Sequence, residues 1–282
     1  MPGGHAILNG FGRTLGDGII GLQALAAARV LGAVAGRPVL FRLPGLAPMV
    51  QAAYEVASDL AEIGLLPWED ATPDRPFAPA AGFARVTDMR DFAFDPAFRG
   101  VAMIDYFLRA LGLNPAAVPP GLRRNAWLAP RVVPEIAASG HVLVCPRTNS
   151  KLRDMPDPVH AHILAWLAGR APVLTQSTLP PAERFAQLCG LVAGARLVVS
   201  ADTAMVHLAD AFAVPCLAFF TTHRPEWRVR DYPLCRPVHL AAGLPEALEF
   251  VRDEADIAAC RAAWFAPGAD LAWLDAQLEA VW

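Results

Sequence analysis

Lysine is almost absent from this 282-residue chain. Of its 24 basic residues, 23 are arginine, and Lys151 is the only lysine. The 27 acidic residues bring the formal net charge to −3, which leaves no positive excess for binding a nucleic-acid backbone. A general nucleic-acid binder is therefore not expected. The solitary lysine indicates either a position that needs a compact ammonium group or a codon bias that spared one residue.

Paired cysteines and long apolar runs are also missing. The five cysteines are widely spaced and form no CxxC pair, so we expect reduced and mostly buried thiols. The apolar stretches at 18–28 and 197–220 contain polar residues and fall short of the roughly 18 uninterrupted apolar residues of a membrane span. No signal-peptide pattern is visible at the start. We expect a cytoplasmic protein with at most peripheral contact with the inner face of a membrane.

Common metal and nucleophile motifs are absent as well. The sequence has no DxD, no HExxH, no cysteine cluster and no GxSxG elbow. His160 and His162 are two residues apart on an expected helix, so they point to different faces and form no chelate. We therefore expect no metal and no resident cofactor.

What the chain does have is an alternation of strands and helices in two halves. The first half has expected strands at 6–9, 38–43 and 85–89 and helices at 19–36, 49–63 and 102–113. The second has expected strands at 141–145, 172–175, 196–201 and 215–220 and helices at 158–169, 181–193, 203–213 and 270–282. The proline-rich segment 114–134 is interpreted as an interdomain linker that packs on the surface. The pattern predicts an α/β protein with two Rossmann-like domains, 1–134 and 135–282, facing a central cleft.

Chemistry is expected at the carboxyl ends of the strands, where open parallel sheets bind ligands. The first such loop, 10–18, is rich in glycine and leads into a helix. It is not a clean GxGxxG, so it predicts a nicotinamide site only weakly. Asp17 is either a plain helix N-cap or a general base that faces the cleft. Arg13 in the same loop is a candidate contact for the acceptor or another anion.

The second loop, 146–153, follows a buried strand and is rich in cations and hydroxyl groups. Arg147, Thr148 and Lys151 are suited to hold a phosphate or diphosphate group. The alternative is an ordinary solvated loop.

The third feature is a strand that runs into a helix at Asp202. We expect Asp202 to cap this helix, so that the N–H groups of Thr203, Ala204 and Met205 form an anion site. His207 lies one turn beyond Thr203 and shares its face. The alternative for His207 is a hydrogen-bonded, half-buried structural histidine.

The fourth region, 221–233, is dense in polar and aromatic residues. Thr221 and Thr222 open it, and Arg224 and Arg230 follow beside a tryptophan. These groups can bind an anion or a sugar by charge and stacking. An arginine-rich surface loop is the equal alternative.

These motifs together resemble glycosyltransferase family 9, the heptosyltransferases. The signature region corresponds to residues 188–220, LCGLVAGARLVVSADTAMVHLADAFAVPCLAFF. The segment LGDGIIGLQAL at 15–25 is similar to the Gly-Asp loop and first helix of the family, and AMIDYFLRALGL at 102–113 to its helix before the linker. The resemblance covers most of the chain in order, and its C-terminal motif is specific.

The resemblance implies a GT-B fold and metal-independent, inverting transfer of a sugar from a nucleotide-diphosphate donor. ADP-heptose is the family's default donor, and the implied acceptor is a cell-envelope glycan or a lipid-linked glycan, as in lipopolysaccharide biosynthesis. Asp17 matches the catalytic base and Lys151 the lysine on the donor phosphates. The remaining implied donor-binding residues are Arg147, Thr148, Asp202, Thr203, Ala204, Met205, His207, Thr221 and Thr222.

Two departures from the family pattern stand out. Ala204 occupies the place of a family glycine. Only 51 positions separate Lys151 from Asp202, which predicts a second domain shortened by one βα unit. These departures keep two alternatives open: a non-catalytic sugar- or nucleotide-binding module on a GT-B scaffold, and a GT-B sugar-nucleotide 2-epimerase.

Overall fold

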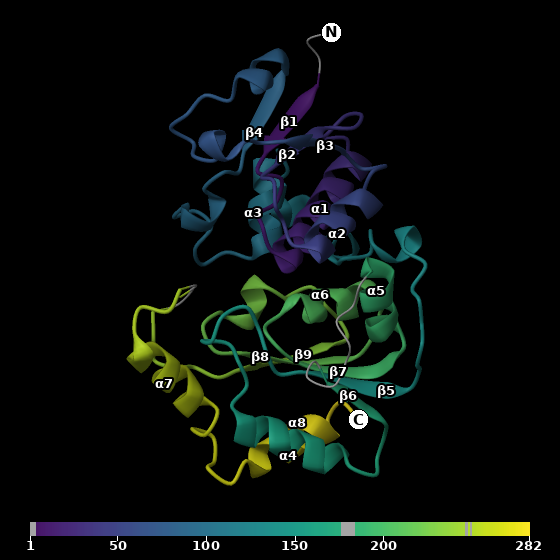
Figure 1. The fold of residues 1–282 in the computed structure, drawn as a ribbon, viewed down its shortest axis with the longest axis vertical. Coiled ribbons are helices and arrows are strands. Elements are labelled where there is room, and N and C mark those ends of the chain that lie inside the picture. The colour runs from purple at the N-terminus through teal and green to yellow at the C-terminus, as the bar shows by residue number, and fades with distance from the viewer. Residues whose placement is uncertain (1–3, 176–183, 246–247, 249) are drawn as a thin grey trace. The chain divides into compact units, whose positions relative to one another are not determined.

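The computed structural model describes residues 4–175, 184–245, 248 and 250–282 (Figure 1). The chain divides into two compact units, Met1–Val133 and Pro134–Trp282. Each unit has a parallel β-sheet and its own covering helices, so each is described by itself.

The sheet of the first unit has four parallel strands in the order β3-β2-β1-β4. The strands are β1 (His5–Leu8), β2 (Val39–Arg42), β3 (Glu62–Leu65) and β4 (Arg85–Asp88). Strand β1 is inner and fully buried, as its apolar sequence requires of a strand covered on both faces. Strand β3 was not predicted, because most of its side chains at this sheet edge are exposed.

Three helices accompany this sheet: α1 (Leu15–Val30), α2 (Pro48–Val56) and α3 (Met103–Ala110). Helix α1 packs against both others. It begins four residues before the predicted start, because Thr14 acts as its N-cap and its hydroxyl accepts the N–H of Asp17. This cap places Asp17 in the first turn of α1.

Residues 114–133, from the proline-rich segment interpreted as an interdomain linker, pack onto the first unit, which ends at Val133. They form short 3-10 turns at Pro115–Ala117, Pro120–Arg123 and Ala129–Arg131 that belong to the first unit. Trp127 is buried and its indole N–H donates to the carbonyl of Ile19 at 2.9 Å. Arg131 binds both carboxylate oxygens of Asp59. A buried aromatic and a bidentate ion pair therefore fasten the segment.

The sheet of the second unit has five parallel strands in the order β6-β5-β7-β8-β9. They are β5 (His141–Cys145), β6 (Val173–Thr175), β7 (Ala195–Ala201), β8 (Cys216–Phe220) and β9 (Cys235–His239). Along the chain, β6 is the one strand that comes between β5 and β7 among residues 141–175 and 184–201. In the sheet itself β5 and β7 are neighbours, and β6 lies at the edge. The six-stranded doubly wound order has one more strand beyond the position of β6, so the described part of the sheet is shorter by one strand, as expected.

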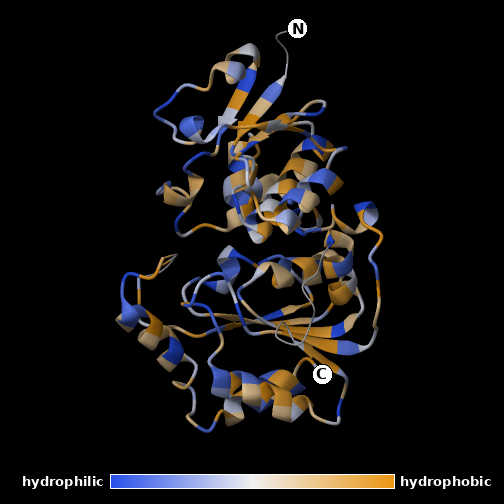
Figure 2. Ribbon diagram, viewed as in Figure 1, coloured by the Kyte–Doolittle hydropathy of each residue, from blue (hydrophilic) through white to orange (hydrophobic). Residues whose placement is uncertain are grey.

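Helices cover both faces of this sheet: α4 (Asp157–Leu167), α5 (Phe185–Ala193), α6 (Ala204–Ala211), α7 (Glu254–Ala263) and α8 (Ala272–Glu279). Figure 1 shows α5 and α6 on one face and α4 and α8 on the other. The core on the α4–α8 side includes Val144, Ile163, Val199, Trp264 and Leu274. Figure 2 shows the sheet strands as mostly hydrophobic, as expected for parallel strands between two helical layers.

All five cysteines are free and four of them are buried, which confirms the prediction of unpaired thiols. Within the described part of the chain, no helix combines the length and the apolar character that crossing a bilayer requires.

Candidate functional site

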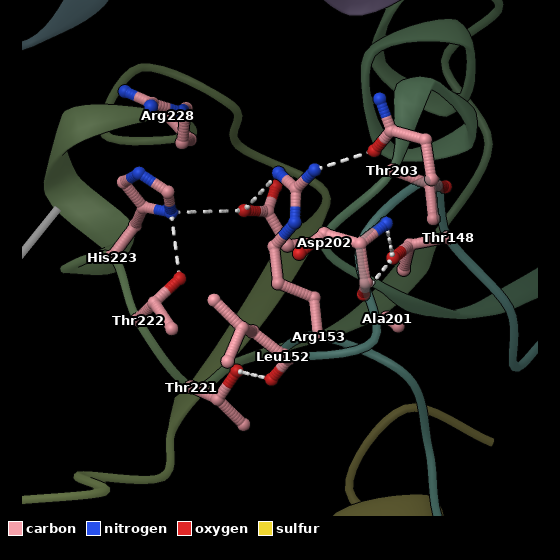
Figure 3. Close-up of polar contacts among 12 residues, drawn as sticks. Thr148, Leu152, Arg153, Ala201, Asp202, Thr203, Thr221, Thr222, His223 and Arg228 are labelled. Atoms are coloured by element: carbon pink, nitrogen blue, oxygen red, sulfur yellow. Dashed lines mark hydrogen bonds and ion pairs between the residues drawn. The ribbon is translucent and has the colours of Figure 1, made fainter. Parts of the chain in front are cut away.

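Three of the predicted strand-end segments meet at one edge of the second sheet (Figure 3). They are the segments that follow β5, β7 and β8, and they converge because β7 lies between the other two strands. The carboxyl ends of parallel neighbours share one edge. The side chain at the centre of this convergence is Asp202.

The Asp202 carboxylate is buried among positive or polar groups. Its Oδ2 lies 3.3 Å from Nη1 of Arg153 and 3.5 Å from Nδ1 of His223. Burial by itself would raise the pKa of Asp202, but Arg153, His223 and the nearby Arg228 hold that pKa well below its usual range. Asp202 is therefore an anion at neutral pH and acts only as a hydrogen-bond acceptor.

Asp202 does not cap the helix, contrary to the prediction. Helix α6 begins at Ala204, and Thr203 is its N-cap. The Thr203 hydroxyl accepts the N–H of Met205 at 3.1 Å and lies 3.0 Å from the hydroxyl of Ser200. The Met205 N–H is thus used within the cap, so the expectation that it forms part of an open anion site is wrong in this conformation. Because the cap is one residue later, the Asp202 side chain is available to Arg153 and His223.

His207 is buried one turn along α6, and its Nδ1 lies 2.9 Å from the hydroxyl of Tyr232. Burial lowers the pKa of His207 to about 4, with Asp202 opposing that shift. The imidazole is therefore neutral at pH 7. This environment is the one that the structural alternative predicts, and a contact with the donor stays a prediction.

The loop after β5 presents its cations in different ways. Arg147 forms an ion pair with Asp157 and donates to the carbonyl of Met155 at 3.1 Å. The Thr148 hydroxyl exchanges hydrogen bonds with the backbone of Ser150, which tightens the turn. Lys151 is exposed, and its ammonium has no hydrogen bond or ion pair with the described residues. Of the three predicted phosphate-binding residues, Lys151 is thus the one whose side chain has no hydrogen-bond or ion-pair partner among the described residues.

Two threonines link the loop after β8 to this site. Both are buried, and the Thr221 hydroxyl donates to the carbonyl of Leu152 at 2.8 Å. The Thr222 hydroxyl lies 3.1 Å from Nδ1 of His223. Thr221 therefore fastens the loop that carries Lys151, and Thr222 contacts a neighbour of Asp202.

The two predicted arginines farther along the chain lie at the surface. Arg224 is exposed, with its guanidinium carbon 5.9 Å from the ring centroid of Trp227. Arg230 is also exposed and forms an ion pair with Asp231. Their contact with an anion or sugar remains a prediction.

Sequence reasoning did not single out Arg153 or His223. Both lie inside predicted strand-end segments, at 146–153 and 221–233, which is the signal that was available. Arg153 also donates to the side-chain oxygen of Asn149 at 2.6 Å. A buried carboxylate needs a compensating positive charge. If Asp202 had been expected to be buried, a cation from the loop of a neighbouring strand would have been the predicted partner.

The first unit holds its own predicted residues at the carboxyl edge of β1. Thr14 rather than Asp17 is the N-cap of α1, so the capping alternative for Asp17 is wrong. A Cβ at Gly12, where φ is +93°, would lie 3.2 Å from Oδ2 of Asp17 and 2.9 Å from the Phe92 ring. Glycine therefore lets the loop pass close to the Asp17 carboxylate. Arg13 is exposed and stacks on Trp68, 4.8 Å from the ring centroid.

The family model described as glycosyltransferase family 9 (heptosyltransferase) matches residues 162–234. This segment contains Asp202, Thr203, His207 and both threonines after β8, but neither Asp17 nor Lys151. No curated protein matches the chain in a sequence comparison.

Several solved structures have a similar fold at low sequence identity. E. coli heptosyltransferase WaaC with ADP is 12% identical, has a TM-score of 0.55, and aligns over 84% of this chain and 93% of its own. E. coli ADP-heptose LPS heptosyltransferase II is 11% identical with a TM-score of 0.57, over 94% and 99%. The iron-containing heptosyltransferase TibC of enterotoxigenic E. coli, in complex with ADP-D-β-D-heptose, is 12% identical with a TM-score of 0.61, over 99% and 76%.

Two parallel sheets of four and five strands match the GT-B architecture of these enzymes. The predicted fold class is thereby confirmed. The predicted resemblance is confirmed as well: the chain has the heptosyltransferase fold, and its second unit carries the signature of glycosyltransferase family 9.

Proposed function

We propose that this protein is a glycosyltransferase that moves a sugar from a nucleotide-diphosphate donor, with ADP-heptose as the donor class, to a cell-envelope glycan or lipid-linked acceptor. One observation carries the proposal. Two of the three loops that converge on buried Asp202, those after β7 and β8, lie within the segment that matches the family. The third loop, after β5, carries Lys151, whose ammonium has no partner among the described residues. The second unit is the donor domain in this proposal, and the first unit is the acceptor domain.

In the second unit, Lys151 neutralises charge on the donor diphosphate. Backbone N–H groups at Thr203 and Ala204, at the start of α6, add partial positive charge. Asp202 accepts a hydrogen bond from a hydroxyl of the donor sugar. Arg153 and His223 offset its negative charge, which reduces its repulsion of the diphosphate.

In the first unit, Asp17 is the general base. It removes the proton from an acceptor hydroxyl as that oxygen attacks the anomeric carbon. The bond from this carbon to the diphosphate oxygen breaks on the opposite side, so the configuration inverts. The nucleoside diphosphate leaves with the bonding electron pair, and the charges around Lys151 stabilise it.

Calorimetric titration with ADP tests the donor site. Wild-type protein is expected to bind ADP, and Lys151→Ala to bind it at least about tenfold more weakly, the equivalent of about 1.4 kcal/mol. The matched control is Arg170→Ala, which removes an exposed cation of the same unit that stacks on Trp166; its ADP affinity is expected to be unchanged. Equal ADP binding by wild type and Lys151→Ala would contradict the proposal.

Asp17→Asn separates binding from chemistry. The variant is expected to bind ADP like wild type and to release ADP from ADP-heptose at least about 100-fold more slowly in the presence of an acceptor. The non-catalytic alternative is favoured by Ala204 and by the short course of the described chain from β5 to β7, in which β6 is the one intervening strand among residues 146–175 and 184–194. It predicts instead that ADP binds and that Asp17→Asn changes nothing measurable.

A further inference from the structure

Arg42 is a buried cation with an unused hydrogen-bonding edge. It is the last residue of β2, and only 4% of its surface is exposed. Its Nε and Nη2 atoms are buried and have no hydrogen-bond partner among the described residues. Its guanidinium carbon lies 3.5 Å from the ring centroid of Tyr54. The ring covers one face of the guanidinium, but a ring face does not take up the in-plane donors of the Nε–Nη2 edge.

Other arginines of this chain bind carboxylates through the same pair of atoms, Nε and Nη2. Arg90 uses Nε and Nη2 to hold both oxygens of Asp88. Arg131 holds Asp59 in this way at 2.8 and 2.7 Å, and Arg252 holds Asp256 at 2.9 and 2.6 Å. Two parallel N–H donors fit the two oxygens of a carboxylate or phosphate. In Arg42 the same two donors have no carboxylate partner among the described residues.

The position of Arg42 connects this edge to the glycine-rich loop. A Cβ at Gly10 would lie 3.2 Å from Cγ of Arg42 and 3.4 Å from the hydroxyl of Tyr54. Gly10 has a φ of +52°, which a side chain disfavours. The Tyr54 hydroxyl accepts the N–H of Phe11 at 3.1 Å. Arg42 and Tyr54 therefore lie against the loop that leads into α1, the helix whose first turn carries Asp17.

The charges around Arg42 and the 10–12 loop favour the binding of an anion. Burial lowers the pKa of Arg42, and two neighbours oppose this shift: Tyr54, which covers one face of the guanidinium, and Glu55, which is exposed. The 16-residue helix α1 starts beside the same loop and adds the partial positive charge of its N-terminus. A buried cation without an anionic partner is unfavourable for folding, so a ligand that supplies the charge is expected to be bound tightly.

We propose that the Nε–Nη2 edge of Arg42, with the 10–12 loop, forms a subsite for a carboxylate or phosphate group. The assignment of that group to the sugar acceptor rests on the proposed function. Both nitrogens are buried, so the oxyanion reaches them through a local shift of the covering groups. Held there, an anionic substituent anchors the acceptor in the same unit as Asp17. Arg42 is thus a specificity-determining residue for acceptors that carry an oxyanion.

A direct test follows the guanidinium itself. In full-length protein labelled with ¹⁵N-arginine, the Nε–Hε resonance of Arg42 is assigned by its loss in Arg42→Lys. Titration with inorganic phosphate, and separately with acetate, at constant ionic strength is expected to shift this resonance saturably. The two titrations tell a phosphate site from a carboxylate site. No saturable shift with either anion, or a water molecule seated on both nitrogens that neither anion displaces, would overturn the proposal.

Variants give an independent readout. Inorganic phosphate is expected to raise the melting temperature of wild type and of Arg37→Met, which removes an exposed cation of the same unit. In Arg42→Met the phosphate-induced rise is expected to be smaller than in wild type, because only the stabilisation by phosphate at the proposed Lys151 site is left, while the ADP affinity stays within about twofold of wild type. An undiminished rise in Arg42→Met refutes the subsite. The ADP titration of Lys151→Ala tests the proposed function and does not involve Arg42. A negative result there is therefore distinguishable from a negative result for the Arg42 subsite.

Discussion

Arg153 and Asp202 form a largely buried ion pair, with Nη1 of the arginine 3.3 Å from Oδ2 of the aspartate. The two residues come from loops after different strands, β5 and β7. The pair therefore holds two strand-end loops together at the edge where the donor is proposed to bind. It also fixes the ionisation of Asp202, because a carboxylate beside a guanidinium resists protonation.

Asp202→Asn is expected to lower the free energy of unfolding by about 3–5 kcal/mol at pH 7, since Arg153 would be left buried without its counter-charge. The folded-state pKa of Asp202 is depressed, so its stabilising contribution is present above the unfolded value of about 3.9 and is lost as pH falls below it. Urea unfolding of wild type and variant between pH 7 and pH 3 measures this difference.

The control for Asp202 is Asp157→Asn, which removes the partner of Arg147 in an exposed ion pair. That change is expected to cost no more than about 1 kcal/mol. A difference between wild type and Asp202→Asn that stays constant down to pH 3 would contradict the ionised, paired state of Asp202.

His207 predicts a second pH dependence. Its pKa falls from an ordinary 6.5 to about 4 in the folded protein, so protonation favours the unfolded chain. Wild type is expected to lose up to about 3 kcal/mol through this group as pH falls from 6.5 to 4. His207→Gln removes that loss, which urea unfolding across this range detects. His239→Gln, at an exposed position, should retain the wild-type pH profile, and an identical profile for His207→Gln would contradict the buried neutral state.

Gly190 in α5 is a tight packing point. A Cβ there would lie 2.0 Å from the carbonyl oxygen of Glu135, a backbone atom that cannot move aside cheaply. Gly190→Ala is expected to destabilise the protein by about 1–3 kcal/mol or more. Gly121→Ala, where nothing lies within 4 Å of the added Cβ, is the control and should be close to neutral. Thermal unfolding compares the two, and equal melting temperatures would refute the close approach.

Trp127 tests whether residues 114–133 are part of the first unit. Trp127→Phe keeps the aromatic bulk but leaves the Ile19 carbonyl without its indole donor, so a loss of about 1 kcal/mol is expected. Trp68→Phe, at a half-exposed position, is the matched change and should have little effect. Chemical denaturation monitors both. A segment that behaves as a free linker would show no difference between them.

The strands that could be predicted from the sequence are the buried ones, because burial on both faces requires a run of apolar residues. HVLVC was identified as a strand at 141–145, and β5 occupies the same residues. Strands β3 and β9 were missed because they form sheet edges. β3 is largely exposed, and β9 contains Pro237, which an edge strand tolerates. Neither has the apolar run by which a central strand is recognised.

The sequence predicted which segments form the site, but not which side chains contact one another within it. Strand-end segments were selected correctly because parallel topology places them at one edge. The partners of Asp202 were missed because Arg153 and His223 are far from it in sequence and no local pattern links them. The capping residue was misassigned by one position. Asp and Thr are both favoured caps, and the choice depends on the extended backbone of Thr203, with φ −137° and ψ 172°.

The chain passes from one unit to the other within a very short stretch. Arg131 is held by Asp59 on one side, and the Glu135 N–H donates to the carbonyl of Ala186 on the other. Only residues 132–134 lie between these anchors, and Val133 is 87% exposed. Despite its many prolines, the connection is thus a joint with a handful of rotatable bonds. A single protease cut at Val133 should divide the polypeptide without severing a strand or helix of either sheet.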